Sequence, residues 1–201
     1  MKAVCDVDNV LADFEEALVE RLCEIDPIAE TLNRDLYSLE KRYEMHPKLL
    51  DAALSFTERP SSYGFALKPI YTGVKFVNEL ISRGWEVLFL SARPGGSAFR
   101  NQTSRWLEHY IDDYYNTRGC LLGVSAKVEI TEEWGGILVD DNPDLVEFAN
   151  KRGTKAYAWD QPWNEGVFPR LVCDREGTVY IWKDEATEEV PFFSVYEMEA
   201  E

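Results

Sequence analysis

Four aspartates occur as two pairs, and each pair follows an apolar run that is typical of a buried β-strand. Asp6 and Asp8 follow the run that begins at Lys2, and Asp140 and Asp141 follow the run 136–139. Open α/β sheets bind their ligands at the carboxyl ends of parallel strands, so we expect the two pairs to meet at one sheet edge. Carboxylates gathered there would repel one another unless a cation lay among them. Because hard divalent ions prefer oxygen ligands, the sequence predicts a Mg²⁺ site.

These acids also have a plainer interpretation, as the strand-end and helix-cap residues that any α/β protein carries. One pair alone would fit that interpretation, whereas two pairs in the same layout favour a metal. Asp144 is not counted among the metal acids, because Asn142, Pro143 and Asp144 together read as a helix start. They supply a cap, a first-turn proline and an acid that complements the helix dipole.

Acids in this arrangement could hydrolyse a phosphate ester. That reaction needs a nucleophile, a proton donor for the leaving oxygen, and positive charge around the phosphoryl oxygens. Side chains two apart on a strand point the same way, so Asp6 and Asp8 could divide the first two roles. Asp6 would form an aspartyl-phosphate, and Asp8, pushed toward protonation by its acidic neighbours, would protonate the leaving alkoxide. A metal would offset the repulsion between carboxylate and phosphate.

Two further residues could contribute the positive charge and the hydrogen bonds. Ser91 follows the apolar run 85–90, where its hydroxyl and nearby backbone N–H groups could hold a phosphoryl oxygen, although a helix cap is the commoner role. Lys127 lies in a segment poor in Lys and Arg, shortly before the run that carries Asp140. A lone lysine is usually a solvated surface group, so each signal is weak by itself.

Alternating periodicities predict the elements that must position these residues. Strand-like runs and helical stripes take turns, which indicates an α/β fold with a Rossmann-like parallel sheet. The expected strands are residues 2–7, 85–90, 120–124, 137–139 and 154–158. The expected helices are residues 10–25, 71–83, 98–110 and 143–151.

The domain organisation follows from the segments that break this alternation. Residues 15–69 are charged, helix-prone and interrupted by three prolines, which predicts a small helical cap inserted after the first strand. The cap would lie at the same sheet edge as the acids and could act as a lid. Residues 1–14 and 70–169 would form the catalytic core. Residues 170–201 are expected to form a β-hairpin and an acidic tail.

Composition limits the partners. The chain has 201 residues with 37 acidic and 21 basic side chains, a net charge of −16, which disfavours a long nucleic acid but admits a small, metal-masked anion. Four scattered cysteines and two isolated histidines imply neither a disulfide framework nor a zinc site. The early first strand and the lack of a long apolar run lead us to expect a cytoplasmic protein without a membrane partner. A homodimer is left open.

The order of the motifs resembles the haloacid dehalogenase (HAD) superfamily of phosphatases over about residues 1–160. The resemblance implies that Asp6 is the nucleophile, Asp8 the general acid/base, and Ser91 and Lys127 the phosphate-holding hydroxyl and cation. It also implies that Asp140 and Asp141 are metal acids. The Mg²⁺ ligands would be the Asp6 carboxylate, the Asp8 backbone carbonyl and Asp141, with Asp140 acting through a water.

Within the superfamily, the opening DVDNVLADF is similar to that of the 5′(3′)-deoxyribonucleotidases, which usually carry Gly at the position of Asn9. Asparagine tolerates a left-handed backbone better than most residues, so Asn9 could adopt the conformation that the usual glycine adopts. The segment DQPWN at 160–164 is also similar to that family. Phe14 occupies the position of an aromatic residue that stacks on the base in those enzymes, and core packing is the alternative. The expected substrate-binding residues are Phe14, Phe65, Ser91, Ala92, Arg93 and Lys127, with Tyr63 as a weaker candidate.

The leading interpretation is a Mg²⁺-dependent phosphatase of nucleotide metabolism that acts on small nucleoside monophosphates, and the resemblance implies deoxynucleoside ones. The stretch SARPGGSAFRNQTSRWLEHY also looks like polynucleotide 3′-phosphatases, with Arg93, Arg100 and Arg105 available for phosphates. The net charge argues against that polymeric substrate. A non-enzymatic metal- or phosphate-binding module, similar to a receiver domain, is the alternative from another class.

Overall fold

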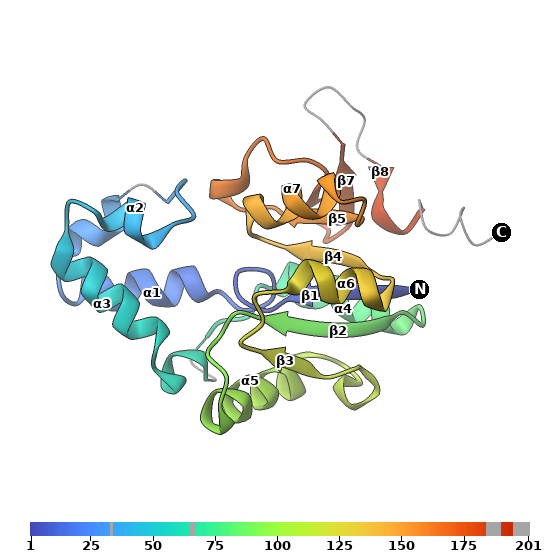
Figure 1. The fold of residues 1–201 in the computed structure, drawn as a ribbon, viewed down its shortest axis with the longest axis horizontal. Coiled ribbons are helices and arrows are strands. Elements are labelled where there is room, and N and C mark those ends of the chain that lie inside the picture. The colour runs from blue at the N-terminus through green and yellow to red at the C-terminus, as the bar shows by residue number, and fades with distance from the viewer. Residues whose placement is uncertain (33, 65–66, 184–189, 195–201) are drawn as a thin grey trace.

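The structure is a computed structural model that describes residues 1–32, 34–64, 67–183 and 190–194. Its centre is an eight-stranded sheet with the strand order β3-β2-β1-β4-β5-β6-β7-β8 (Figure 1). Neighbouring strands from β3 to β6 are parallel, and β7 and β8 are antiparallel additions. The strands are β1 (Lys2–Asp6), β2 (Glu86–Ser91), β3 (Cys120–Leu122), β4 (Ile137–Asp140), β5 (Ala156–Trp159), β6 (Arg170–Cys173), β7 (Val179–Trp182) and β8 (Val190–Pro191). The predicted Rossmann-like α/β fold is confirmed.

Helices cover both faces of the sheet because successive strand residues point to opposite sides. Val4 and Leu138 point to the face covered by α6 and α7, and Cys5 and Val139 point to the face covered by α4 and α5. Each face has its own buried apolar cluster. The core helices are α4 (Tyr71–Ser82), α5 (Ser97–Tyr110), α6 (Lys127–Trp134) and α7 (Pro143–Lys151).

A group of helices between β1 and α4 lies at the end of the sheet toward which the strand β2 points, drawn in blue to cyan in Figure 1. It contains no strand among its described residues. Its α-helices are α1 (Phe14–Cys23), α2 (Leu39–Tyr43) and α3 (Pro47–Thr57), with short 3₁₀ turns at Pro27–Thr31 and Pro60–Tyr63. These helices are therefore placed over the edge that carries Asp6.

The first helix begins later than the sequence pattern predicts. The helical stripe suggested a start at residue 10, but α1 begins at Phe14. Asn9 adopts a positive φ of 58°, and the N–H groups of Leu11 and Ala12 donate to the carbonyl of Val7, which closes a tight loop instead of a first helical turn. The Asp13 side chain then caps the helix by accepting from the backbone N–H of Glu16 at 3.0 Å. The buried Leu11 therefore belongs to the loop that follows the first acid pair.

The C-terminal strands extend the main sheet. β6 pairs in parallel with β5, and β7 returns antiparallel to β6 with Leu171 opposite Ile181. Phe192 packs edge-on against Phe76 of α4, with ring centroids 4.9 Å apart. Most of the expected acidic tail, residues 184–189 and 195–201, lies outside the described residues. In the described part of the chain, every helix is too short or too polar to cross a lipid bilayer.

Candidate active site

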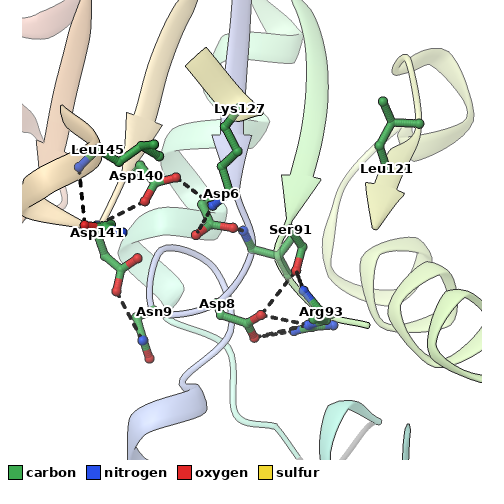
Figure 2. A network of polar contacts seen from close by, with 12 residues as sticks. Asp6, Asp8, Asn9, Ser91, Arg93, Leu121, Lys127, Asp140, Asp141 and Leu145 are labelled. Carbon is green, nitrogen blue, oxygen red and sulfur yellow. Dashed lines mark hydrogen bonds and ion pairs between the residues drawn. The ribbon is translucent and has the colours of Figure 1, made fainter. Parts of the chain in front are cut away.

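Three aspartates converge where β1 and β4 end side by side. Asp6 is the last residue of β1, Asp140 is the last residue of β4, and Asp141 follows it. Each offers a carboxylate oxygen, and these oxygens all lie within 4.8 Å of one another. All three side chains are buried (Figure 2). Because Cys5 and Val139 are register partners, the two strand ends bring these acids to one point.

Lys127 lies directly against this cluster. Asp6 shares its face of the sheet with Val4 because the two are two residues apart on β1, and α6 covers that face. Lys127 is the first residue of α6, and its Nζ is 2.7 Å from Asp6 Oδ2 and 2.7 Å from Asp140 Oδ2. Its side chain is only 8% exposed, so it is not a solvated surface lysine.

The cluster carries more negative charge than the lysine can balance. Burial raises the pKa of Asp6 to about 7, against the lowering effect of Lys127, and Asp140 and Asp8 raise it further. Burial and the charges of Asp140 and Asp6 also raise the pKa of Asp141 well above its ordinary value. Burial disfavours the charged form of Lys127, but the two carboxylates outweigh it and raise the lysine's pKa, so the ammonium form persists. Three buried carboxylates around one ammonium thus favour a further cation.

The donor set fits Mg²⁺. Both oxygens of Asp140 are engaged, one by Lys127 and the other by the backbone N–H of Asn142 at 3.0 Å. Among the described residues, the Asp141 carboxylate accepts a hydrogen bond from Asn9 Nδ2 at 3.2 Å, through Oδ2. Both Asp6 oxygens are engaged as well, by Lys127 and by the backbone N–H of Val7 at 2.7 Å. By this comparison Asp141 is better placed than Asp140 to offer an oxygen directly to a hard cation.

Asp8 lies apart from these three acids. Its guanidinium partner is Arg93, with Nε 2.9 Å from Asp8 Oδ2 and Nη2 2.6 Å from Asp8 Oδ1. Figure 2 shows the Asp8 side chain beside Ser91 and Arg93, while Asp6 lies beside Lys127. The idea that strand alternation points Asp6 and Asp8 in one direction is wrong, because β1 ends at Asp6 and Asp8 lies in the loop beyond it.

The segment after β2 supplies the partners of Asp8. Ser91, at the end of β2, is fully buried, and its hydroxyl donates to Asp8 Oδ2 at 3.4 Å. The same hydroxyl accepts from the backbone N–H of Arg93 at 3.1 Å. Ala92 between them is exposed and lines the cavity over the acids. The structure thus places Ser91, Ala92 and Arg93 at the predicted edge, with the Arg93 guanidinium bonded to protein groups.

A cavity of about 470 Å³ lies between the acids and the cap helices. Phe14 lines it, but the ring is 9% exposed and stacks on Tyr63 at 5.3 Å with an interplanar angle of 10°. One face of Phe14 is therefore already covered within the protein. Phe65, the other expected wall residue, lies outside the described residues. The remaining lining includes Asn9, Leu18, Tyr37, Leu39, Glu40, Thr57, Pro94 and Trp163.

Sequence reasoning missed the aromatic and ionic groups on the cap side of this cavity. Tyr37 lies 6.3 Å, centroid to centroid, from Trp163 of the core. Arg42 forms a buried ion pair with Glu15 and also donates to the carbonyl of Leu36. Tyr37 and Arg42 lie in a charged, helix-prone stretch whose pattern does not set them apart from their neighbours. Short helices of this kind bury and expose charged residues without a clear period.

Asn9 and the segment 160–164 brace the loops that carry the acids. Besides its bond to Asp141, Asn9 accepts from the backbone N–H of Glu15 at 2.9 Å through Oδ1 and from Gln161 Nε2 at 2.7 Å through its carbonyl. Trp163 Nε1 and Asn164 Nδ2 both donate to the carbonyl of Asp141 at 3.1 Å. Asn9 thus supplies both the positive φ expected at this position and side-chain contacts that a glycine would lack.

Comparison with known proteins places this arrangement in a recognised fold. No protein-family model matches the chain. A Bordetella bronchiseptica protein named "Putative 5′(3′)-deoxyribonucleotidase" is 27% identical over 183 residues, which cover 87% of this chain and 91% of that protein.

Solved structures agree on the fold. A structure titled "putative phosphoglycolate phosphatase" from Lactobacillus delbrueckii subsp. bulgaricus matches with a TM-score of 0.53 and 13% identity, covering 79% of this chain and 85% of that one. A dehalogenase solved as an intermediate complex matches with a TM-score of 0.53 and 18% identity, covering 83% and 89%. The chain therefore has the fold of these phosphatase and dehalogenase structures, and a relative in sequence carries a nucleotidase name.

Proposed function

We propose that this chain is a Mg²⁺-dependent phosphomonoesterase that hydrolyses nucleoside monophosphates, with deoxynucleoside monophosphates as the preferred class. The observation that carries the proposal is the buried cluster of Asp6, Asp140 and Asp141 around Lys127, beneath a cavity that can hold a small molecule. A bound Mg²⁺ would balance the excess negative charge of the carboxylates and of a substrate phosphate. Asp6 and Asp141 would hold it.

The chain's own residues can divide the reaction into two displacements. In the first, an Asp6 oxygen bonds to phosphorus, the ester P–O bond breaks, and the leaving alkoxide takes a proton from Asp8. In the second, water attacks the aspartyl-phosphate, Asp8 accepts the water's proton, and the bond between phosphorus and Asp6 breaks. The products are inorganic phosphate and a nucleoside, and both aspartates return to their starting states. Lys127 holds Asp6 in place and contributes positive charge throughout.

The cavity supports a mononucleotide substrate. Its volume of about 470 Å³ lies within the range of small-ligand sites, and its walls combine Phe14, Tyr37, Tyr63 and Trp163 with the acids. The nucleotidase name of the Bordetella relative points to the same substrate class. A polynucleotide is less well supported, because the net charge is −16 and the exposed Arg100 and Arg105 are outside the described lining of the cavity.

The decisive experiment measures phosphate release from a panel of ribo- and deoxyribonucleoside monophosphates, a short 3′-phosphorylated oligonucleotide and p-nitrophenyl phosphate. Wild type with Mg²⁺ should turn over the mononucleotides best. Asp6→Asn should lose several orders of magnitude in kcat, because the amide is nearly isosteric but a poor nucleophile. Asp144→Asn is the matched control, since Asp144 is an exposed acid at the start of α7 and should leave turnover unchanged.

Each outcome discriminates between the candidate functions. Turnover retained by Asp6→Asn would remove Asp6 as the nucleophile, and activity that survives exhaustive chelation would remove the metal. A clear preference for the oligonucleotide at moderate salt would replace the mononucleotide with a polynucleotide substrate. No phosphate release from any ester would favour the non-enzymatic module.

A further inference from the structure

The environment of Arg93 differs from what a phosphate-binding role requires. Its side chain is fully buried, whereas the side chain of Asp8, its partner, is 21% exposed. Both residues line the cavity, but the Asp8 side chain has exposed surface there and the Arg93 side chain has none. Resting on the proposed function, we infer that Arg93 is a positioning residue that acts on catalysis through Asp8 and does not bind the substrate phosphate.

Each of the three guanidinium nitrogens donates to a protein group. Nε and Nη2 both donate to Asp8, and Nη1 donates to Thr103 Oγ1 at 2.8 Å. The ring of Tyr63 lies over the guanidinium, 4.7 Å from centroid to Cζ. The Arg93 side chain has no exposed surface, so a phosphate could reach the guanidinium only if one of its present neighbours moved.

This arrangement gives Asp8 a fixed direction that the backbone alone does not provide. Asp8 lies beyond the end of β1, immediately before the left-handed Asn9. Two parallel N–H···O bonds from one planar fork fix both the position and the plane of the carboxylate. Proton transfer to the leaving oxygen requires a heavy-atom separation within about 2.6–3.2 Å, so an Asp8 that could rotate would spend less time in a productive position.

The same contacts keep Asp8 separate from the metal acids. Without Arg93, the Asp8 carboxylate would be free to turn toward the cation site at Asp6 and Asp141, where a bound Mg²⁺ would attract it. Thr103 of α5 and the Ser91 hydroxyl at the end of β2 hold Arg93 from behind, because Thr103 accepts from Nη1 and the Ser91 hydroxyl accepts from the Arg93 backbone N–H. The loop after β2 thus sets the orientation of a residue that belongs to the loop after β1.

The test compares Arg93→Lys and Arg93→Met with wild type on two substrates that differ in leaving group, a deoxynucleoside monophosphate and p-nitrophenyl phosphate. The nucleoside is a poor leaving group, so its departure depends on proton donation. p-Nitrophenolate is a good leaving group and departs without a proton. We expect kcat/KM on the nucleotide to fall by about 10²–10³-fold, within the range of about 10²–10⁴-fold for loss of general acid catalysis, and kcat/KM on the aryl ester to fall by less than about tenfold. This ratio reports on the steps up to the first displacement, so the part that Asp8 plays in the second displacement does not enter it. The inhibition constant for inorganic phosphate should change by no more than about threefold.

Arg118→Lys is the matched control. Arg118 also donates to a carboxylate through Nε and Nη2, both to Glu86 Oε2, but on the exposed surface. It should leave both substrates unaffected. Circular dichroism and thermal unfolding of Arg93→Met identify a folding failure, in which case Arg93→Lys, which keeps the buried charge but loses the planar fork, carries the comparison.

A second arm places Arg93→Lys in an Asp8→Asn background. Because Arg93 acts through Asp8, the additional loss on the nucleotide there should be less than about threefold. A phosphate ligand would behave differently: both substrates would lose alike, KM and the inhibition constant for inorganic phosphate would rise, and the loss would persist in Asp8→Asn. That result would overturn the positioning role while leaving the phosphatase function intact. A wild type inactive on both esters would refute the proposed function, and the role of Arg93 with it.

Discussion

Replacing Lys127 with methionine should reveal how the protein holds three acids together. Methionine keeps the length and most of the apolar stem of the lysine but removes the ammonium that bonds Asp6 and Asp140 at 2.7 Å each. All three partners are buried, so water cannot take over the lost interaction. The variant leaves buried carboxylates without a balancing cation. Removing one partner of a buried ion pair costs more free energy of unfolding than replacing both partners with apolar residues.

The size of the effect follows from this burial. Removing one partner of a buried pair costs about 3–5 kcal/mol, and Lys127 serves two carboxylates, so the upper half of that range is expected without metal. For a chain of this size, each kcal/mol lowers Tm by about 2–4 °C, which gives a fall of roughly 8–20 °C. Lys151→Met is the matched control, because it removes an exposed pair with Glu147 and should cost about 0.5 kcal/mol or less.

The assay is urea and thermal unfolding of wild type, Lys127→Met and Lys151→Met, each with chelator and with Mg²⁺. A divalent ion that binds the folded cluster at a hundredfold excess over its Kd stabilises by about 2.7 kcal/mol. The ion should stabilise Lys127→Met at least as much as wild type, because the variant has a larger charge excess to relieve. A metal-free Lys127→Met within about 1 kcal/mol of wild type, or a Mg²⁺ effect absent from both proteins, would refute this account of the cluster.

Three further predictions follow from the same geometry. Asp141→Ala should weaken Mg²⁺ binding in calorimetry more than Asp140→Ala, because both Asp140 oxygens are already engaged; the reverse order would mean that Asp140 is the direct ligand. Without metal, burial raises the pKa of Asp6 from 3.8 to about 7, so the folded state binds more protons than the unfolded state between these values. The unfolding free energy should therefore fall as pH rises from about 4 to about 7 and flatten with Mg²⁺; a urea midpoint that rises over this range would contradict it. Gly73→Ala should be strongly destabilising, since its Cβ would meet the carbonyl oxygen of Val10 at 1.9 Å, whereas Gly95→Ala meets nothing within 4 Å; equal Tm values for the two would show that the Val10 loop yields easily.

The sequence predicts the convergence of Asp6, Asp140 and Asp141 because each residue is tied to the end of an apolar strand. Strand identity and parallel order are enough to bring such residues to one edge. Lys127 was predicted from the order of the motifs along the chain. The structure gives the physical reason for its position, because Lys127 begins α6 and α6 covers the face of the sheet that Asp6 shares with Val4.

The pairing of Asp8 with Arg93 could not be predicted in the same way. Both residues lie just beyond strand ends, where the period of two no longer applies and the backbone direction depends on individual φ and ψ angles. The register that places Asp6 opposite Leu90 brings the two loops together, but nothing in the composition of either strand specifies that register. The late start of α1 has the same origin, because the loop at Asn9 interrupts an apolar stripe that otherwise reads as continuous helix.

Two buried cations therefore divide four acids into groups with different chemistry. Lys127 holds Asp6 and Asp140 beside Asp141, and Arg93 holds Asp8 on the neighbouring loop. An ammonium contacts two acids from different strands as a point charge, which suits a cluster that must also admit a divalent ion. A guanidinium fork orients one carboxylate in a plane, which suits a residue that must transfer a proton in a set direction. Since the two cations share no carboxylate, the proposed nucleophile and metal site can be held independently of the proposed proton donor, while both groups line one cavity.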